Sequence, residues 1–395
     1  MRNPVTITLL ALLLCIPVFL FSRNTLVEQR GMRFDFYPRY VGMQAFWNGE
    51  SPYAQSVTDR IQLGMYGELQ PEDADQQRFA HPAYSAVLLA PFLTLPADTA
   101  IALWITLQFA ALLATPFLWL RILRWNPQPL LFLLLIVGLI FVFRYPILSY
   151  LWGQFTGGIV FLLSLAILLL KQKRPVWAGA ALALAAVPPS ISGPLTVLVL
   201  GGYVLNGKYW RAAGVFIAIL AITSLIAILR IGWWLPDFLA GISAYGDYAH
   251  PVWALDYLPA LLRPISVIGL AVVIIWLFWR WRAAARDSTQ AATEWQRQLD
   301  FICGSILVTL LLVPQTGNYY LVLCIPVFMI TLYRLRSAKQ WRWLGYALVI
   351  VAVLSPWLWL LLRLPDVETL VTPLLVGLAW TVSLVRKASQ TISTN

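Results

Sequence analysis

The chain has 395 residues, 60% of them hydrophobic and only 11% charged, and its formal net charge is +11. Soluble proteins carry about 25% charged residues, so this composition excludes an ordinary soluble domain and indicates an all-α polytopic membrane protein. The basic charge does not indicate a nucleic-acid partner, because the sequence contains no basic patch interleaved with aromatic residues and no RNA-binding motif.

The chain begins with Arg2 and an apolar segment from about residue 5 to residue 21. A signal peptide is the alternative interpretation. The segment is long and lacks the small-x-small pattern of a cleavage site, which favours an uncleaved span. Further apolar segments follow at residues 99–120, 128–144, 152–170, 175–188, 192–206, 211–230, 257–280, 300–313, 319–333, 343–362 and 367–385. Together they predict about twelve transmembrane helices in a single integral membrane domain, residues 1–395.

A polar segment, residues 23–98, separates the first two predicted spans and is expected to be an external loop. Pro38 favours the start of a short helix that runs to about Phe46 and ends at Asn48 and Gly49. Residues 82–95 are apolar but short for a span and contain Pro91, so they predict a helix lying in the membrane interface. Residues 231–256 are expected to form a second external loop.

The distribution of charge predicts the orientation in the membrane. With the N-terminus in the cytoplasm and residues 82–95 outside, the cytoplasmic side receives 18 of the 28 basic residues and three of the 17 acids. Cytoplasmic loops of membrane proteins carry this excess of Lys and Arg. We therefore expect a multi-pass protein of the plasma membrane with both termini in the cytoplasm and its polar chemistry outside.

Asp35 is the first candidate for a catalytic residue. It lies between two phenylalanines, with Arg33 two residues before it and Arg39 four after it. One interpretation is a solvated loop acid paired to one of these arginines. The other is a general base toward a hydroxyl group, because an ionisable group at an aromatic membrane boundary is costly unless it has a use.

Several other chemistries find no support in the sequence. It lacks the glycine patterns of nucleotide-binding loops, a nucleophile elbow and a zinc-protease motif. The three cysteines, Cys15, Cys303 and Cys324, fall inside apolar segments, and the two histidines, His81 and His250, are far apart. We therefore expect neither a metal site nor a cofactor.

Arg144 is the candidate contact for a lipid phosphate, because the planar guanidinium suits phosphate oxygens. Simple snorkelling of an arginine at the end of a span is the alternative. The remaining candidates are polar or aromatic residues expected to line a pocket: Arg33, Tyr37, Arg39, His81, Gln154, Asn318 and Tyr320. Helix capping for Gln154, an aromatic interfacial belt for residues 318–320 and a surface position for His81 are the alternatives.

Four stretches, taken in order, resemble glycosyltransferase family 87, the bacterial polyprenyl-phosphate-mannose-type mannosyltransferases of the GT-C fold. The stretch Asp35–Tyr40 with Trp47–Tyr53 resembles the family's first loop, and Phe79–Pro96 resembles its interfacial helix. Trp152–Gln154 resembles its Gly-Gln motif, and Val313–Pro326 resembles a late span of the family.

The resemblance implies a membrane enzyme with Asp35 as the catalytic base. It implies transfer of a hexose, mannose above all, from a polyprenyl-phosphate donor to a lipid or glycan acceptor, with inversion at the anomeric carbon and without a bound metal. The expected partners are that donor, that acceptor and membrane lipids.

The sequence departs from the family at two places. The family usually has Lys-Pro where this chain has Val187-Pro188-Pro189, and often a histidine at Asn318-Tyr319. Both positions are implied to lie near the donor phosphate or the acceptor. An altered donor, compensation by Arg144 or Arg230, and an inactive scaffold member of the family therefore stay open, as does a lipid or solute transporter or flippase.

Overall fold

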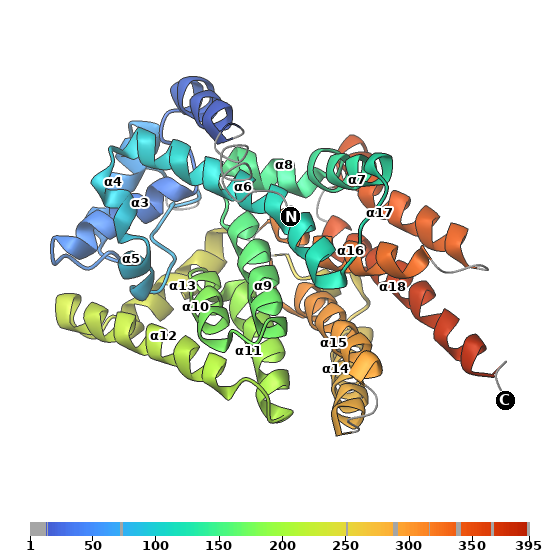
Figure 1. Cartoon of the computed structure of the whole chain (residues 1–395). Helices are drawn as coiled ribbons and strands as arrows, with labels where there is room; N and C mark the ends of the chain where they lie inside the picture. Colours follow the sequence, from blue (N-terminus) through green and yellow to red (C-terminus); the bar gives the residue numbers. More distant parts are fainter. Residues whose placement is uncertain are drawn as a thin grey trace.

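The computed structural model describes residues 13, 15–71, 74–249, 252–286, 291–315, 317–336, 341–364 and 367–392. Apart from one isolated β-bridge between Val252 and Gln315, the regular structure within these ranges is helical (Figure 1). The helices of segment 23–98 and its borders are η1 (Ser22–Val27), α2 (Glu28–Arg30), α3 (Phe36–Trp47), α4 (Gln55–Tyr66), α5 (Tyr84–Leu88) and η2 (Ala90–Thr94).

The remaining helices follow in an almost unbroken series. They are α6 (Ala97–Leu123), α7 (Pro129–Ile136), η3 (Val137–Val142), α8 (Arg144–Trp152), α9 (Thr156–Lys171), α10 (Pro175–Ala185), α11 (Pro189–Leu205), α12 (Trp210–Ile231), α13 (Leu235–Ala249), η4 (Ala254–Tyr257), α14 (Leu262–Arg286), α15 (Ala291–Leu312), η6 (Asn318–Leu323), α16 (Cys324–Leu335), α17 (Arg342–Leu361) and α18 (Glu368–Ile392).

Among the residues that the structure describes, five stretches are long and apolar enough to cross a membrane: α6, α12, α14, η6 with α16, and α17. The segments 129–142 and 144–152, bent by 53° at Phe143, make a sixth if they are one broken span. The all-α polytopic class is therefore confirmed, and every apolar segment predicted after residue 98 coincides with helix. The predicted count of about twelve spans is not confirmed, because several of these helices have only 10–17 residues.

The structure describes only part of the N-terminal segment and does not give the orientation of the protein in the membrane. Residues 1–12 lie outside the described residues, so most of the predicted first span cannot be compared with the structure. The side on which each terminus lies, the plasma-membrane location and the single-domain description stay predictions.

Segment 23–98 folds much as the sequence predicts. Helix α3 ends at Trp47 with Asn48 as its C-cap, and Gly49 follows with φ +80°. Residues 82–95 form two short helices, α5 and η2, and no span. In Figure 1, α3, α4 and α5 gather at one end of the molecule, beside the start of α6, while α17 and α18 lie at the other end.

Helices α6 and α9 pack closely and support the segment that carries the site. A Cβ atom on Gly157 would lie 2.7 Å from the carbonyl oxygen of Gln108, so only glycine allows this approach. The Gln108 side chain accepts a hydrogen bond from the Gly158 N–H at 2.7 Å, and Trp119 Nε1 donates to Ser164 Oγ at 2.8 Å. These buried contacts fix the two helices against each other.

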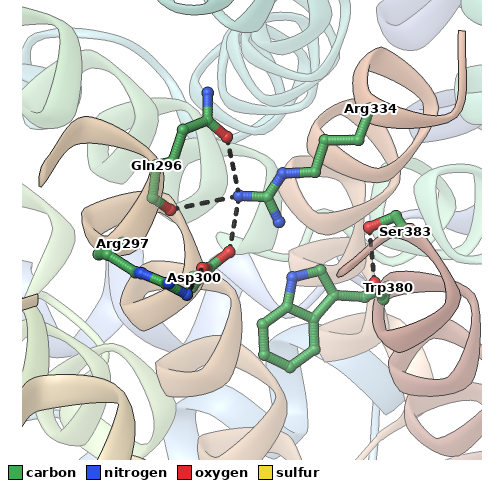
Figure 2. Close-up of polar contacts among 6 residues, drawn as sticks. All are labelled: Gln296, Arg297, Asp300, Arg334, Trp380 and Ser383. Atoms are coloured by element: carbon green, nitrogen blue, oxygen red, sulfur yellow. Dashed lines mark hydrogen bonds and ion pairs between the residues drawn. The ribbon is translucent and has the colours of Figure 1, made fainter. Parts of the chain in front are cut away.

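A buried ion pair joins α15 to α16 (Figure 2). Arg334 Nη2 lies 2.6 Å from Asp300 Oδ1 and donates to the Gln296 carbonyl oxygen at 3.2 Å, and Arg297 approaches Asp300 at 3.8 Å. The Trp380 side chain of α18 lies beside this group. The network therefore contributes to the packing of the late helices. The sequence predicts that this end of the bundle faces the cytoplasm.

Candidate functional site

A cavity of about 770 Å³ lies between segment 23–98 and the helices that follow it. Its wall comes from the start of α3, residues 75–81, α8 with the turn after it, residues 188–190, α13, Pro314 and residues 317–320. Seven of the nine predicted site residues lie on this wall: Asp35, Arg39, His81, Arg144, Gln154, Asn318 and Tyr320. The structure therefore brings together stretches that are far apart in the sequence, while the chemical roles of these residues stay predictions.

The backbone around Asp35 is fixed by the aromatic residues on either side. Phe34 and Phe36 are fully buried, and the Phe36 ring stacks on Trp104 with centroids 4.5 Å apart. The Asp35 N–H donates to the carbonyl oxygen of Trp152 at 3.1 Å. With its neighbours anchored in the core, Asp35 holds its half-buried side chain on the cavity wall.

The Asp35 carboxylate is not paired with either neighbouring arginine. Arg33 Nε donates to the Met65 carbonyl oxygen at 3.1 Å, and Arg39 Nε donates to His81 at 2.7 Å. Among the described residues, no cation lies within ion-pairing distance of Asp35. The interpretation of a loop acid paired to Arg33 or Arg39 is therefore wrong.

Burial raises the pKa of the Asp35 carboxyl to about 6 from its ordinary 3.8. The Arg39 cation opposes this rise, the Asp75 carboxylate adds to it, and Arg30 opposes it. A carboxylate with a pKa near 6 is about ten to one ionised at pH 7 and binds a proton more strongly than an ordinary aspartate. That is the property a general base needs at neutral pH.

His81 and Arg39 form a second polar unit of the wall. Because Arg39 Nε donates to His81 Nε2, the imidazole is neutral and carries its proton on Nδ1. Burial, aided by the Arg39 cation, lowers the pKa of His81 well below its ordinary value. The Tyr53 hydroxyl also donates to the His81 carbonyl oxygen at 2.7 Å. His81 therefore serves as a neutral support that orients Arg39.

Arg144 lies on the wall, but its charge is already compensated. The guanidinium forms an ion pair with Glu368, whose side chain is fully buried, and the Arg144 side chain itself is only 11% exposed. The sequence predicts Arg144 as a phosphate contact, and this partner from α18 was not expected. Its main electrostatic neighbour in the structure is thus a protein carboxylate.

The other wall residues add hydroxyl and amide groups. Gln154 is 5% exposed, and its N–H donates to the Ser149 carbonyl oxygen at 2.9 Å. Tyr320 Oη lies 3.3 Å from Ser190 Oγ, which joins η6 to the start of α11. The positions at which the sequence departs from the family pattern also lie here: Pro188, Pro189, Asn318 and Tyr319.

Arg33 and Tyr37 do not line this cavity. Arg33 bonds to Met65 and lies over the Tyr66 ring, 5.7 Å from its centroid. Tyr37 faces the other side of α3, where it lines a second, open cavity of about 500 Å³. The pocket-lining role expected of these two residues therefore does not apply to the cavity that contains Asp35.

Sequence reasoning missed four residues of the site or its support: Asp75, Arg78, Ser190 and Glu368. Asp75 is held by Gln77, which donates from its backbone N–H at 3.0 Å and from Nε2 at 2.7 Å. Asp75 and Arg78 fall in a polar stretch without periodicity, so only their charge marked them. Glu368 carried a usable signal, because an acid at the start of an apolar segment is costly unless it is paired.

No group of three His, Cys, Asp or Glu side chains that could hold a metal ion occurs in the described part of the chain. The polar groups of the cavity are instead two carboxylates, three guanidinium groups, an imidazole and several amides and hydroxyls. Such a wall can accept a proton from a hydroxyl group and can bind an anion.

No family model matches this chain, and no curated protein matches it. The chain is similar to the crystal structure of ArnT from Cupriavidus metallidurans bound to undecaprenyl phosphate. That similarity covers 97% of this chain and 77% of the other, with 11% sequence identity and a TM-score of 0.46. A likeness of this size says nothing about chemistry, and membership of glycosyltransferase family 87 stays a prediction.

Proposed function

We propose that this protein is an integral membrane glycosyltransferase of GT-C-like architecture. It transfers a hexose, mannose in the first instance, from a polyprenyl-phosphate donor to a lipid or glycan acceptor on the non-cytoplasmic face. The cavity that contains Asp35 is the active site in this proposal. The observation that carries it is an unpaired carboxylate with a raised pKa on the wall of a large cavity in a membrane protein.

The proposed reaction is a single displacement. Asp35 takes the proton of an acceptor hydroxyl, and the oxygen attacks the anomeric carbon of the donor sugar. The bond from that carbon to the phosphate oxygen breaks, and the lipid phosphate leaves with the bonding electron pair. The configuration at the anomeric carbon is therefore inverted. Asp35 then loses its proton to water. The step needs no oxidant and no further reactant.

Three features of the site support this chemistry. The carboxylate has no cation at ion-pairing distance among the described residues, so its lone pairs are available to a hydroxyl. The cavity volume suits a sugar with its phosphate, since ligand pockets commonly measure about 300–1,000 Å³. Guanidinium groups on the same wall supply the positive charge that a leaving phosphate requires.

The test is a transfer assay with full-length purified protein in lipid nanodiscs and a panel of polyprenyl-phosphate sugars. We expect transfer from at least one donor, lowered about 10²–10⁴-fold in Asp35→Asn. Asp59→Asn is the matched control, because this acid lies on α4 outside the cavity and accepts a bond from Gln55 at the surface. Lipid translocation is followed in parallel: movement without transfer indicates a flippase, and binding without either indicates an inactive member.

A further inference from the structure

The cavity has three cations on its wall, and they differ in what they already bind. Arg39 donates from Nε to His81 and is 6% exposed. Arg144 is paired with Glu368. Each of these arginines therefore has a protein partner that holds its side chain in place.

Arg78 is the third cation, and it differs from the other two. No hydrogen bond or ion pair joins its side chain to any of the described residues, and its Nε atom is buried. A buried guanidinium N–H without an acceptor destabilises the folded protein. That cost is recovered when an anion in the cavity accepts the bond.

The sequence around Arg78 explains how it comes to lie on the wall. Gln76 is buried, and its side-chain amide donates to the carbonyl oxygens of Pro71 and Ala74. Gln62 of α4 donates to the Gln76 carbonyl oxygen at 3.1 Å. Phe79 is 3% exposed and its ring lies 5.7 Å from that of Tyr53. Residues on both sides of Arg78 are thus anchored, which holds Arg78 on the cavity wall.

We infer that Arg78 binds the phosphate group of the ligand that occupies this cavity. The identity of that ligand as a polyprenyl-phosphate sugar rests on the proposed function. Arginine presents a planar fork of donors that fits phosphate oxygens. When the sugar leaves, the phosphate gains a negative charge, so Arg78 binds the product phosphate and the transition state more tightly than the donor.

This assignment changes the role of Arg144. Its partner Glu368 is fully buried, so releasing Arg144 to a ligand would take the Arg144 cation away from a carboxylate in the protein interior. Arg144 is therefore a positioning residue that fixes α8 against α18. Arg78 differs, because it gives up no acceptor among the described residues when it binds a phosphate.

The test measures binding by the full-length protein in nanodiscs, with no sugar present. The probes are a short polyprenyl phosphate, the uncharged polyprenol of the same length, and inorganic phosphate. We expect the wild type to bind the polyprenyl phosphate at least about tenfold more tightly than the polyprenol. Weak binding of inorganic phosphate at the same site would show that the phosphate group is recognised without its lipid.

The variants are Arg78→Gln, Arg78→Lys and Arg23→Gln. Arg78→Gln is expected to remove the preference for phosphate over alcohol, and Arg78→Lys to keep part of it, because lysine retains the charge without the fork. Arg23 also lies in segment 23–98 but forms an exposed pair with Asp98 at 3.6 Å, so Arg23→Gln should bind as the wild type does. Gel filtration and circular dichroism check that each variant is folded.

Two results would overturn the inference: an unchanged preference in folded Arg78→Gln, or an equal loss in Arg23→Gln. The binding test of Arg78 and the transfer test of the proposed function can fail independently. If phosphate binding depends on Arg78 but the protein transfers no sugar, the proposed enzymatic function is wrong and the phosphate site is retained. If the protein transfers sugar and Arg78→Gln leaves KM and kcat unaltered, the enzymatic function is retained and the role of Arg78 is wrong.

Discussion

Arg144 at the start of α8 and Glu368 at the start of α18 form a buried ion pair on the edge of the cavity, although 224 residues separate them. Arg144→Gln removes the Arg144 cation from the buried Glu368 carboxylate. Removing one member of such a pair typically costs about 3–5 kcal/mol of folding free energy. We expect a clear loss of stability, measured as the midpoint of thermal unfolding in detergent.

The double variant Arg144→Met, Glu368→Leu provides the control. Because it removes both charges together, it should recover most of the stability lost in Arg144→Gln. A single variant as stable as the wild type would show that the pair is not needed to hold α8 against α18.

The pH dependence of transfer follows from the raised pKa of Asp35. The base must be ionised, so kcat/KM is expected to fall as the pH drops through about 6, with the half-point near that value. With an ordinary aspartate as the base, the fall in kcat/KM would have its half-point near pH 4. Because the Asp75 carboxylate helps to raise the pKa of Asp35, Asp75→Asn should move this half-point to lower pH. A profile flat from pH 7 down to pH 4 would contradict this assignment.

Asp35 should also lower the stability of the protein at neutral pH. Its carboxyl binds a proton more tightly in the folded than in the unfolded chain, so the folded state is favoured as the pH falls from about 6 toward 4. Asp35→Asn removes the buried charge and is expected to raise stability at pH 7.5 by on the order of 1 kcal/mol. Thermal unfolding of the two proteins at pH 7.5 and pH 4.5 measures this. A variant less stable than the wild type at pH 7.5 would refute the prediction.

Gly153 links α8 to the cavity and has φ +67°. Its carbonyl oxygen accepts a bond from Trp104 Nε1 at 2.7 Å, and the preceding residue, Trp152, accepts the Asp35 N–H. Gly153→Ala should cost about 1 kcal/mol of stability, because alanine is strained in this left-handed conformation. The shift of the turn should also lower kcat through the position of Asp35.

Gly49→Ala is the matched control for Gly153→Ala. Gly49 has φ +80° and nothing lies within 4 Å of the site of an added Cβ, so the strain is similar. It follows α3 at the end remote from Asp35, so kcat should stay unchanged. Equal losses of kcat in the two variants would mean that destabilisation alone explains the effect.

The helices were predictable because their signals are local. Apolar runs of sufficient length predicted most helices after residue 98, and Pro38 with Asn48 and Gly49 predicted the position of α3. Helices α8 and α13 were not predicted, because they lie largely outside the apolar runs. The number of membrane crossings was not predictable to the same degree. Short helices such as α10 and α11 owe their lengths to breaks at Pro175 and Pro189, and hydropathy alone does not distinguish them from full spans.

The site was predictable in part, and helical periodicity explains which part. Asp35 and Arg39 are four residues apart, so they share one face at the start of α3 and both line the cavity. Tyr37 belongs to the opposite face and lines the second cavity. The pairing of Arg144 with Glu368 and the position of Arg78 on the cavity wall depend on tertiary packing. The sequence can mark Glu368 as an acid that needs a partner, but it does not say which residue that partner is.

The central claim is that Asp35 is the base of a sugar transfer, and single-turnover kinetics test it most directly. Full-length protein in nanodiscs is mixed with an acceptor and a radiolabelled polyprenyl-phosphate sugar, with the protein in excess over the labelled donor. Release and transfer of the sugar are followed at pH 7.5. The account predicts transfer by the wild type and the control Asp59→Asn, with a fall of about 10²–10⁴-fold in folded Asp35→Asn. Wild-type transfer rates in Asp35→Asn would contradict the account.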